Sequence, residues 1–148
     1  MKKVTLALVA LCLASCAATV PIAPKVIDES AKLFVAPPDR SVVYIERENA
    51  YKGKAILFQV GMDGKMLGGI AAGTFYAETV APGEHVITAL SNENQDSLRL
   101  STEPGLTYFV KVEPRWGMVS ARVSLKQTDA TEGKRIASSS SLAAGLGR

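Results

Sequence analysis

Short runs of alternating apolar and polar residues fill the chain from Ser41 to about residue 126. The clearest run is 118–126, where every second residue from Val119 to Leu125 is apolar. The runs are rich in β-branched and aromatic residues, and Gly, Pro, Asn and Asp separate them at intervals of roughly ten residues, a pattern typical of all-β proteins. We predict eight strands, over residues 41–47, 55–62, 65–70, 74–80, 85–91, 97–102, 107–113 and 118–126.

The connections between these strands are too short for crossover helices, so we expect mainly antiparallel sheets and one all-β sandwich domain over residues 41–127. Asp63-Gly64 predicts a type I′ hairpin turn, because both residues tolerate positive φ. Pro82-Gly83 and Pro104-Gly105 suit type II turns. Gly68 and Gly69 indicate that strand 65–70 is short, bulged or at a sheet edge.

Alternation also indicates which side chains face inward. Glu46 and Glu48 stand two apart on the first strand and share a face, which is typical of a solvated edge. The sets expected to face inward are Ile56, Phe58 and Val60; Val86, Thr88 and Leu90; Tyr108, Val110 and Val112; and Val119, Ala121, Val123 and Leu125.

The first residues form a different pattern. Lys2 and Lys3 precede an apolar segment, and Ala14, Ser15 and Cys16 end it, which is the layout of a secretion signal. It resembles a bacterial lipoprotein signal, and this resemblance implies that the Cys16 thiol carries a lipid and that residues 1–15 are removed. The alternative is an uncleaved membrane helix, for which the 17 uncharged residues 4–20 are at the lower limit of length.

Two flanking segments complete the organisation. Residues 16–40 contain Pro21, Pro24, Pro37 and Pro38 and are expected to be a lipidated tether, in which residues 28–34 form either a short helix or an irregular linker. The C-terminal segment 128–148 has the composition of a tail: a short helix through Ile136, then fraying or disorder beyond about residue 137.

Charge and cysteine content exclude several classes of protein. The chain has 17 Lys and Arg against 14 Asp and Glu, and loss of the first 15 residues with Lys2 and Lys3 leaves a net charge of about +1. The remaining charges alternate in sign, so we expect no nucleic-acid partner. Cys16 would be the single cysteine of the mature chain, which excludes an intramolecular disulfide and, if lipidated, a thiol nucleophile.

The sequence contains no recognisable reactive site. His85 is the single histidine and stands where a turn enters a strand, so a structural role is favoured over a metal ligand. Nucleophile elbows and phosphate loops are absent. We therefore expect no enzyme, no metal and no cofactor. Arg115 and Trp116 lie between two long strands and are the candidate interaction surface, although a tryptophan there can also cap the end of a sandwich.

Several short motifs, in order and spacing, resemble the DUF2846 lipoproteins of Gram-negative bacteria. The resemblance covers about residues 31–126, and Glu48 departs from it where the family commonly has proline. It implies a small β-sandwich similar to PEGA and prealbumin-like domains, and it implies no activity. The matching elements are the signal ending at Cys16, the opening strand 42–47, Asp63-Gly64-Lys65, Leu67-Gly68, Gly73-Thr74-Phe75-Tyr76, Pro82-Gly83-Glu84-His85 and residues 105–110.

Together these observations predict a non-enzymatic envelope lipoprotein whose sandwich contacts another envelope protein. Ala17 follows Cys16 in place of the aspartate that retains similar lipoprotein chains in the inner membrane, so the expected location is the periplasmic face of the outer membrane. The alternative is a periplasmic module that binds a small ligand, such as a lipid or a peptidoglycan fragment, in a cleft. An enzyme is the third and least favoured class.

Overall fold

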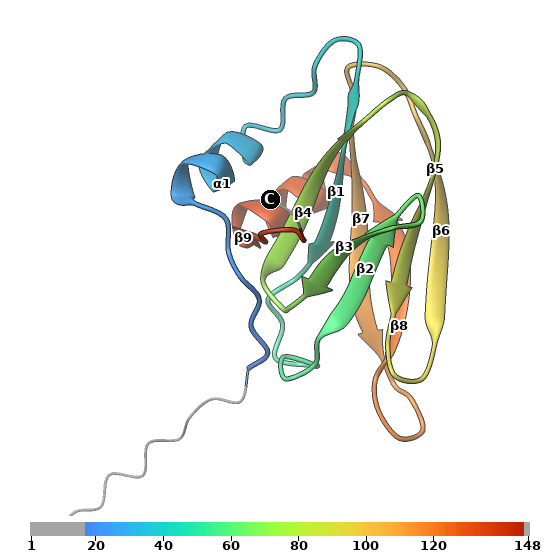
Figure 1. Ribbon diagram of the computed structural model, residues 1–148. Coiled ribbons are helices and arrows are strands. Elements are labelled where there is room, and N and C mark those ends of the chain that lie inside the picture. The colour runs from blue at the N-terminus through green and yellow to red at the C-terminus, as the bar shows by residue number, and fades with distance from the viewer. Residues whose placement is uncertain (1–16, 147–148) are drawn as a thin grey trace, which may run out of the picture.

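The computed structural model describes residues 17–146, in which two sheets and two short helices form a layered domain (Figure 1). Three strands match the sequence prediction residue for residue, and the others differ at their ends. The elements are α1 (Lys25–Ala31), β1 (Ser41–Arg47), β2 (Phe58–Met62), β3 (Lys65–Ile70), β4 (Thr74–Val80), β5 (Gly83–Leu90), β6 (Gln95–Thr102), β7 (Thr107–Arg115), β8 (Arg122–Thr128), α2 (Ala130–Ser138) and β9 (Ser141–Leu142).

The fold is the expected all-β sandwich. One sheet has the strand order β8-β7-β1-β4-β9 and the other β3-β2-β5-β6. Five strand pairs are antiparallel, and two, β1 with β7 and β4 with β9, are parallel. The Asp63-Gly64 turn has positive φ at both residues, as predicted, and β3 lies at a sheet edge.

The main core lies between the two sheets. Phe58, Val60 and Val110 are fully buried there, in agreement with the alternation of β2 and β7. The prediction for β5 is wrong by one residue, because Ile87 and Ala89 are fully buried and Val86 is 37% exposed. A one-residue shift exchanges the two faces of a strand, and here it places the polar His85 ring inward.

A second apolar cluster covers the outer face of the five-stranded sheet. Tyr44 of β1 stacks on Phe109 of β7 at 5.0 Å between ring centroids, and Phe34 lies 5.4 Å from the Tyr44 ring. The Tyr44 hydroxyl donates to the Ala31 carbonyl at 2.8 Å, and its burial raises the pKa of the phenol to about 12. Helices α1 and α2 lie over this face (Figure 1), so β1 is buried on both sides.

The C-terminal segment is part of the fold, and the prediction of fraying beyond residue 137 is wrong. Asp129 caps α2 by accepting from the amides of Thr131 and Glu132. Ile136 and Ala137 are fully buried, and β9 adds a fifth strand to the sheet. The serine-rich composition suggested a tail. Small residues, however, let α2 pack closely on the sheet, and the buried apolar side chains of Ile136, Ala137, Leu142 and Ala143 fix the segment.

The segment expected to be a tether is also docked on the domain. The Ala23 amide donates to the Leu142 carbonyl at 2.9 Å, and the Asp28 carboxylate accepts from the Leu142 amide at 2.7 Å. Helix α1 begins after Pro24, earlier than predicted, and Asp28 lies inside it. A proline-rich composition therefore does not make residues 17–40 a free linker, because β9 supplies backbone partners that the sequence did not reveal.

Candidate functional site

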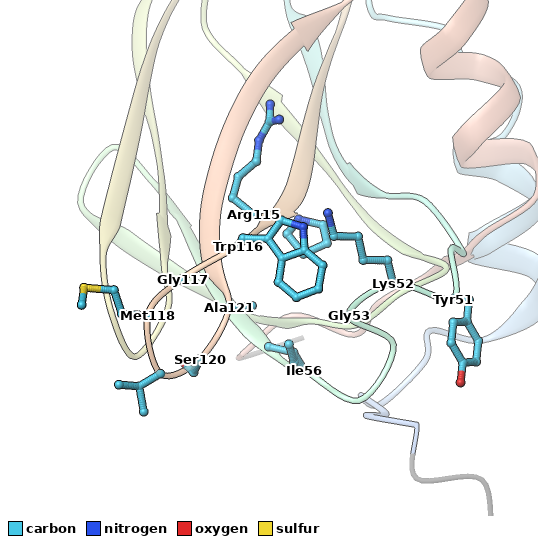
Figure 2. A pocket seen from close by; sticks show the side chains of 12 residues that line it. Tyr51, Lys52, Gly53, Ile56, Arg115, Trp116, Gly117, Met118, Ser120 and Ala121 are labelled. Carbon is cyan, nitrogen blue, oxygen red and sulfur yellow. The ribbon is translucent and has the colours of Figure 1, made fainter.

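An open, mostly apolar hollow of about 680 Å³ lies at one end of the sandwich. Two loops form it, residues 50–57 between β1 and β2 and residues 116–121 between β7 and β8 (Figure 2). Ile56 and Ala121 pack against the main core and line its inner part. The hollow thus opens at the end of the sandwich and does not lie between the sheets.

The first loop is held by a buried arginine. Arg47 is 1% exposed and donates to the carbonyls of Gly53 and Ile56 at 2.6 Å each and to that of Ile70 at 3.1 Å. Its guanidinium also lies 4.6 Å from the centroid of the Phe58 ring. Burial lowers the pKa of Arg47 to about 10. Backbone carbonyls therefore balance this charge, and their pairing fixes the path of residues 53–56.

The second loop is held by a carboxylate. The Glu93 carboxylate accepts hydrogen bonds from the backbone amides of Met118, Val119 and Ser120, and these bonds lower the pKa of Glu93. A side chain at Gly117 would collide with the Ser120 carbonyl and with Glu93. This loop is therefore a compact turn built around one acidic group.

The rim of the hollow is apolar and exposed. Tyr51 and Met118 are each 97% exposed, Val119 is 95% exposed and Trp116 is 85% exposed. Lys52 places its ammonium 4.9 Å from the centroid of the Trp116 ring. Figure 2 shows these two side chains next to each other. Large apolar groups gathered on a rim are unusual for an inert surface and mark a contact region.

The two residues chosen from the sequence have different surroundings. Trp116 lies on this rim with most of its surface exposed, so it does not seal the core. Arg115 pairs with Glu113 of the same strand at 2.9 Å and also lines the hollow. Cys16, the predicted lipidation site, lies outside the described residues 17–146.

The described chain begins beside the same end of the sandwich. The Ala18 amide donates to the carbonyl of Lys54 in the first rim loop at 3.1 Å. In Figure 1 the blue start of the described chain and both rim loops lie at the lower end of the molecule. Between residues 17 and 146 no helix combines the length and the apolar character needed to span a bilayer.

A cluster of charged side chains lies on the outer face of the five-stranded sheet. Glu46 is fully buried in β1, and neither of its carboxylate oxygens has a hydrogen-bond partner among the described residues. Lys111 beside it contacts Glu48 and Glu132 at 3.1 Å each, and Glu113 at 3.5 Å. Burial, together with repulsion from Glu132, raises the pKa of Glu46 to about 8.

The expectation of a solvated edge is therefore wrong for Glu46. Strand β1 is central, between β4 and β7, and α2 covers this face. A neutral carboxyl at that position costs much less than a buried carboxylate would, which explains the raised pKa.

His85 has a structural environment. Its Nδ1 lies 2.7 Å from the Asp63 carboxylate and its Nε2 lies 2.8 Å from the Ala81 carbonyl. The ring therefore joins the turn between β2 and β3 to the connection between β4 and β5. Burial opposes protonation, but the Asp63 and Ala81 contacts outweigh it and raise the pKa of His85. Among residues 17–146 no group of three His, Cys, Asp or Glu side chains is arranged to hold a metal ion.

Taken together, these features define a small β-sandwich protein with two covering helices and an open apolar hollow at one end. The chain belongs to the family described as protein of unknown function DUF2846, whose model matches residues 37–124, more than half of the chain. An uncharacterized protein from Haemophilus influenzae is 34% identical over 136 residues, which cover 91% of this chain and 80% of that protein. No solved structure matches.

Sequence reasoning missed several residues that form the hollow. Tyr51 stands outside every predicted strand, and Val119 was assigned to the inner face of a strand that in fact begins at Arg122. The alternation Val43, Ile45, Arg47 did carry a signal for the buried arginine, because these residues share one face. Glu93 gave no such signal, since its partners are backbone amides 25 or more residues away.

Proposed function

We propose that this protein is a lipid-anchored lipoprotein of the bacterial envelope and that its β-sandwich is a non-enzymatic interaction domain. The observation that carries the proposal is the signal pattern that ends at Cys16. Ala18, two residues after that cysteine, is hydrogen-bonded to Lys54, so an anchor at Cys16 would be close to the domain. An acyl chain gains about 0.8 kcal/mol per buried methylene, so several chains would make attachment effectively permanent.

Replacement of the predicted lipidation site tests the anchor. Full-length Cys16→Ser should accumulate as the unprocessed precursor without lipid, whereas the parent chain should be processed and labelled by radioactive palmitate. Cys12→Ser is the matched control, because Cys12 lies inside the signal and should be dispensable. Normal processing and labelling of Cys16→Ser would refute the anchor.

The location of the anchored protein is a separate part of the proposal. Ala17 stands where similar lipoproteins retained in the inner membrane have aspartate, and this favours the periplasmic face of the outer membrane. Density fractionation should place the parent chain with the outer membrane and Ala17→Asp with the inner membrane. Recovery of the parent chain in the inner-membrane fraction would contradict the location.

Exposed apolar side chains support the role of an interaction domain. Besides the rim of the hollow, a strip along residues 22–35 exposes Val26, Leu33 and Val35 by 69%, 70% and 74%. Such a surface fits an envelope protein partner. Cross-linking in the native envelope should recover a defined partner, and Leu33→Ser with Val35→Ser should weaken its capture. Recovery of nonspecific neighbours alone would oppose a protein partner.

The hollow favours a second candidate, a module for a small ligand. Its volume of about 680 Å³ is in the range of ligand sites, and Lys52 and Arg115 offer charged groups beside an apolar lining. A lipid or peptidoglycan fragment that binds there should change the fluorescence of Trp116 in a saturable way. Fragments that leave this fluorescence unchanged would remove the candidate.

A further inference from the structure

We propose that the rim of the hollow is a membrane-docking surface, and that Tyr51, Trp116, Met118 and Val119 enter the headgroup region of the bilayer that holds the lipid anchor. This inference rests on the proposed function. It assigns the bilayer as the partner of the rim, and the strip along residues 22–35 stays the proposed contact surface for a protein.

The position of the chain start limits the distance between this surface and the bilayer. Cys16 precedes Ala18 by two residues, which span at most about 7 Å when fully extended. The Ala18 amide is hydrogen-bonded to Lys54, and Lys54 belongs to the loop that carries Tyr51 and Lys52. A lipid on Cys16 therefore brings the bilayer surface to this end of the sandwich and not to the opposite end.

The chemistry of the rim fits an interface between water and lipid. Tryptophan and tyrosine prefer the headgroup level, because each ring has an apolar body and a polar group. Met118 and Val119 add apolar surface at the tip of the second loop, where they are almost fully exposed. The bilayer itself would remove these exposed apolar groups from water, so no protein partner would be needed to cover them.

The charges around the rim favour an anionic surface. Lys52 and Lys54 are exposed on the first loop and have no ion pair among the described residues. The nearby acidic groups are engaged within the protein: Glu113 pairs with Lys111 and Arg115, and Glu93 accepts the amides of the second loop. Basic side chains beside an inserted apolar tip are the arrangement that binds anionic phospholipids.

Both loops are fixed, which suits insertion of several side chains at once. Arg47 holds residues 53 and 56, and Glu93 holds residues 118–120. A surface that is ordered before it meets the membrane loses less conformational freedom on docking.

Trp116 is the single tryptophan of the chain, so its fluorescence reports directly on this surface. The test uses the full-length lipidated protein in vesicles of phosphatidylethanolamine and phosphatidylglycerol that contain phospholipids brominated on their acyl chains. We expect a blue-shifted emission, loss of roughly half of the fluorescence to the brominated lipids, and weak quenching by acrylamide from the water phase, as for an indole at headgroup level.

Two variants make the test specific. Tyr51→Ser, Met118→Ser and Val119→Ser together should abolish the quenching by brominated lipid while the protein stays attached through its anchor. Leu33→Ser with Val35→Ser removes exposed apolar groups from the other surface and should leave the quenching unchanged. All five positions are outside the core, so both variants should fold.

The outcomes separate this inference from the proposed function. An attached protein whose Trp116 is open to acrylamide and unaffected by brominated lipid would overturn the docking surface and leave the anchor intact. Protection from acrylamide without quenching by brominated lipid would also overturn it, because the indole would then be shielded by protein and not by lipid. A full-length chain that carries no lipid would overturn the proposed function, and the inference with it.

Discussion

Adjacent charged residues of β1 point to opposite faces of the sheet and are balanced in different ways. Arg47 points into the sandwich, where carbonyl groups and the Phe58 ring surround its charge. Glu46 points toward α2 and has no hydrogen-bond partner among the described residues. The guanidinium can stay charged because its donors are satisfied, whereas the carboxyl avoids the cost of burial by holding its proton.

Glu46 should make the fold less stable as the pH rises. Its pKa is about 8 in the fold and near 4.5 in an unfolded chain, so between these values only the unfolded chain releases the proton. The free energy of unfolding should fall by roughly 1 kcal/mol per pH unit across this window and level off above it. Glu46→Gln should remove most of this slope, as measured by urea unfolding from pH 5 to pH 8.

Glu48→Gln is the matched control for that series. Hydrogen bonds from Arg135 and Lys111 lower the pKa of Glu48, so its contribution is lost as the pH falls and not as it rises. This variant should keep the slope above pH 5. An unchanged slope in Glu46→Gln would show that Glu46 is ionised in the fold.

His85 and Asp63 offer a second test of the electrostatics. The pKa of His85 is raised, so its stabilising contact is fully present below its unfolded pKa of about 6.5 and is lost as the pH rises through the folded value. Asp63→Asn keeps a residue that tolerates the positive φ of the turn and removes the charge. The pKa of His85, read from the single imidazole signal in an NMR titration, should fall. An unchanged pKa would contradict the assigned role of Asp63.

The sequence could indicate some of these single-residue roles and not others. The alternation of β1 indicated that Arg47 faces inward, and the Asp63-Gly64 signal indicated that Asp63 lies in a tight turn. The burial of Glu46 could not be predicted, because it depends on α2, which covers β1 from 80 or more residues away. Local patterns report which residues share a face, but they do not report what covers that face.

Helix α2 packs so closely on the sheet that one methyl group should disturb it. An added Cβ at Gly133 would lie 2.1 Å from the Phe109 ring. Alanine in place of glycine usually stabilises a helix by about 0.4–1 kcal/mol, but overpacking here should reverse the sign and cost roughly 1–3 kcal/mol. Thermal unfolding of Gly133→Ala checks this, with the exposed Ser138→Ala as control. A stabilised Gly133→Ala would mean that α2 is not docked.

Helix α1 should be released when its link to β9 is removed. The Asp28 carboxylate accepts the Leu142 amide at 2.7 Å and contacts Lys32 at 2.6 Å. Asp28→Ala should speed tryptic cleavage after Lys32 by roughly tenfold, the equivalent of about 1.5 kcal/mol for one charged hydrogen bond. Glu29→Ala, which loses only an exposed contact with Lys25, is the control. Equal rates in both variants would restore the interpretation of residues 17–40 as a free tether.

At the level of elements, prediction succeeded where the signal is local. Strands 41–47, 65–70 and 74–80 and the Asp63-Gly64 hairpin follow from alternation and turn chemistry. The docked position of α2 depends on its packing against β1 and β7. The positions of α1 and β9 also depend on contacts between the two ends of the chain, such as the pair Ile22 and Ala143. Composition alone made both ends resemble linkers, because each contributes few apolar residues and gains its order from contacts with the sheet and with the other end.

Two of the four edge strands, β8 and β3, are covered by other parts of the chain. The side chains of Asn94 and Asp96 form hydrogen bonds with the backbone of β8, and the Leu146 amide donates to the Leu67 carbonyl of β3. Edge strands covered in this way are poor templates for strand addition. We therefore expect the proposed contacts to use the loops around Trp116 and the strip along residues 22–35.

At the scale of the whole molecule, the proposed lipid at Cys16 would hold the described domain close to the membrane, since Ala18 already contacts Lys54. The orientation of the sandwich, the use of the apolar rim and the location in the envelope all depend on a lipid at Cys16. The most direct test is the intact mass of the protein extracted from its native membranes. We predict a chain that starts at Cys16 and carries diacylglyceryl and acyl groups on that residue, and an unmodified chain or one that retains residues 1–15 would contradict the account.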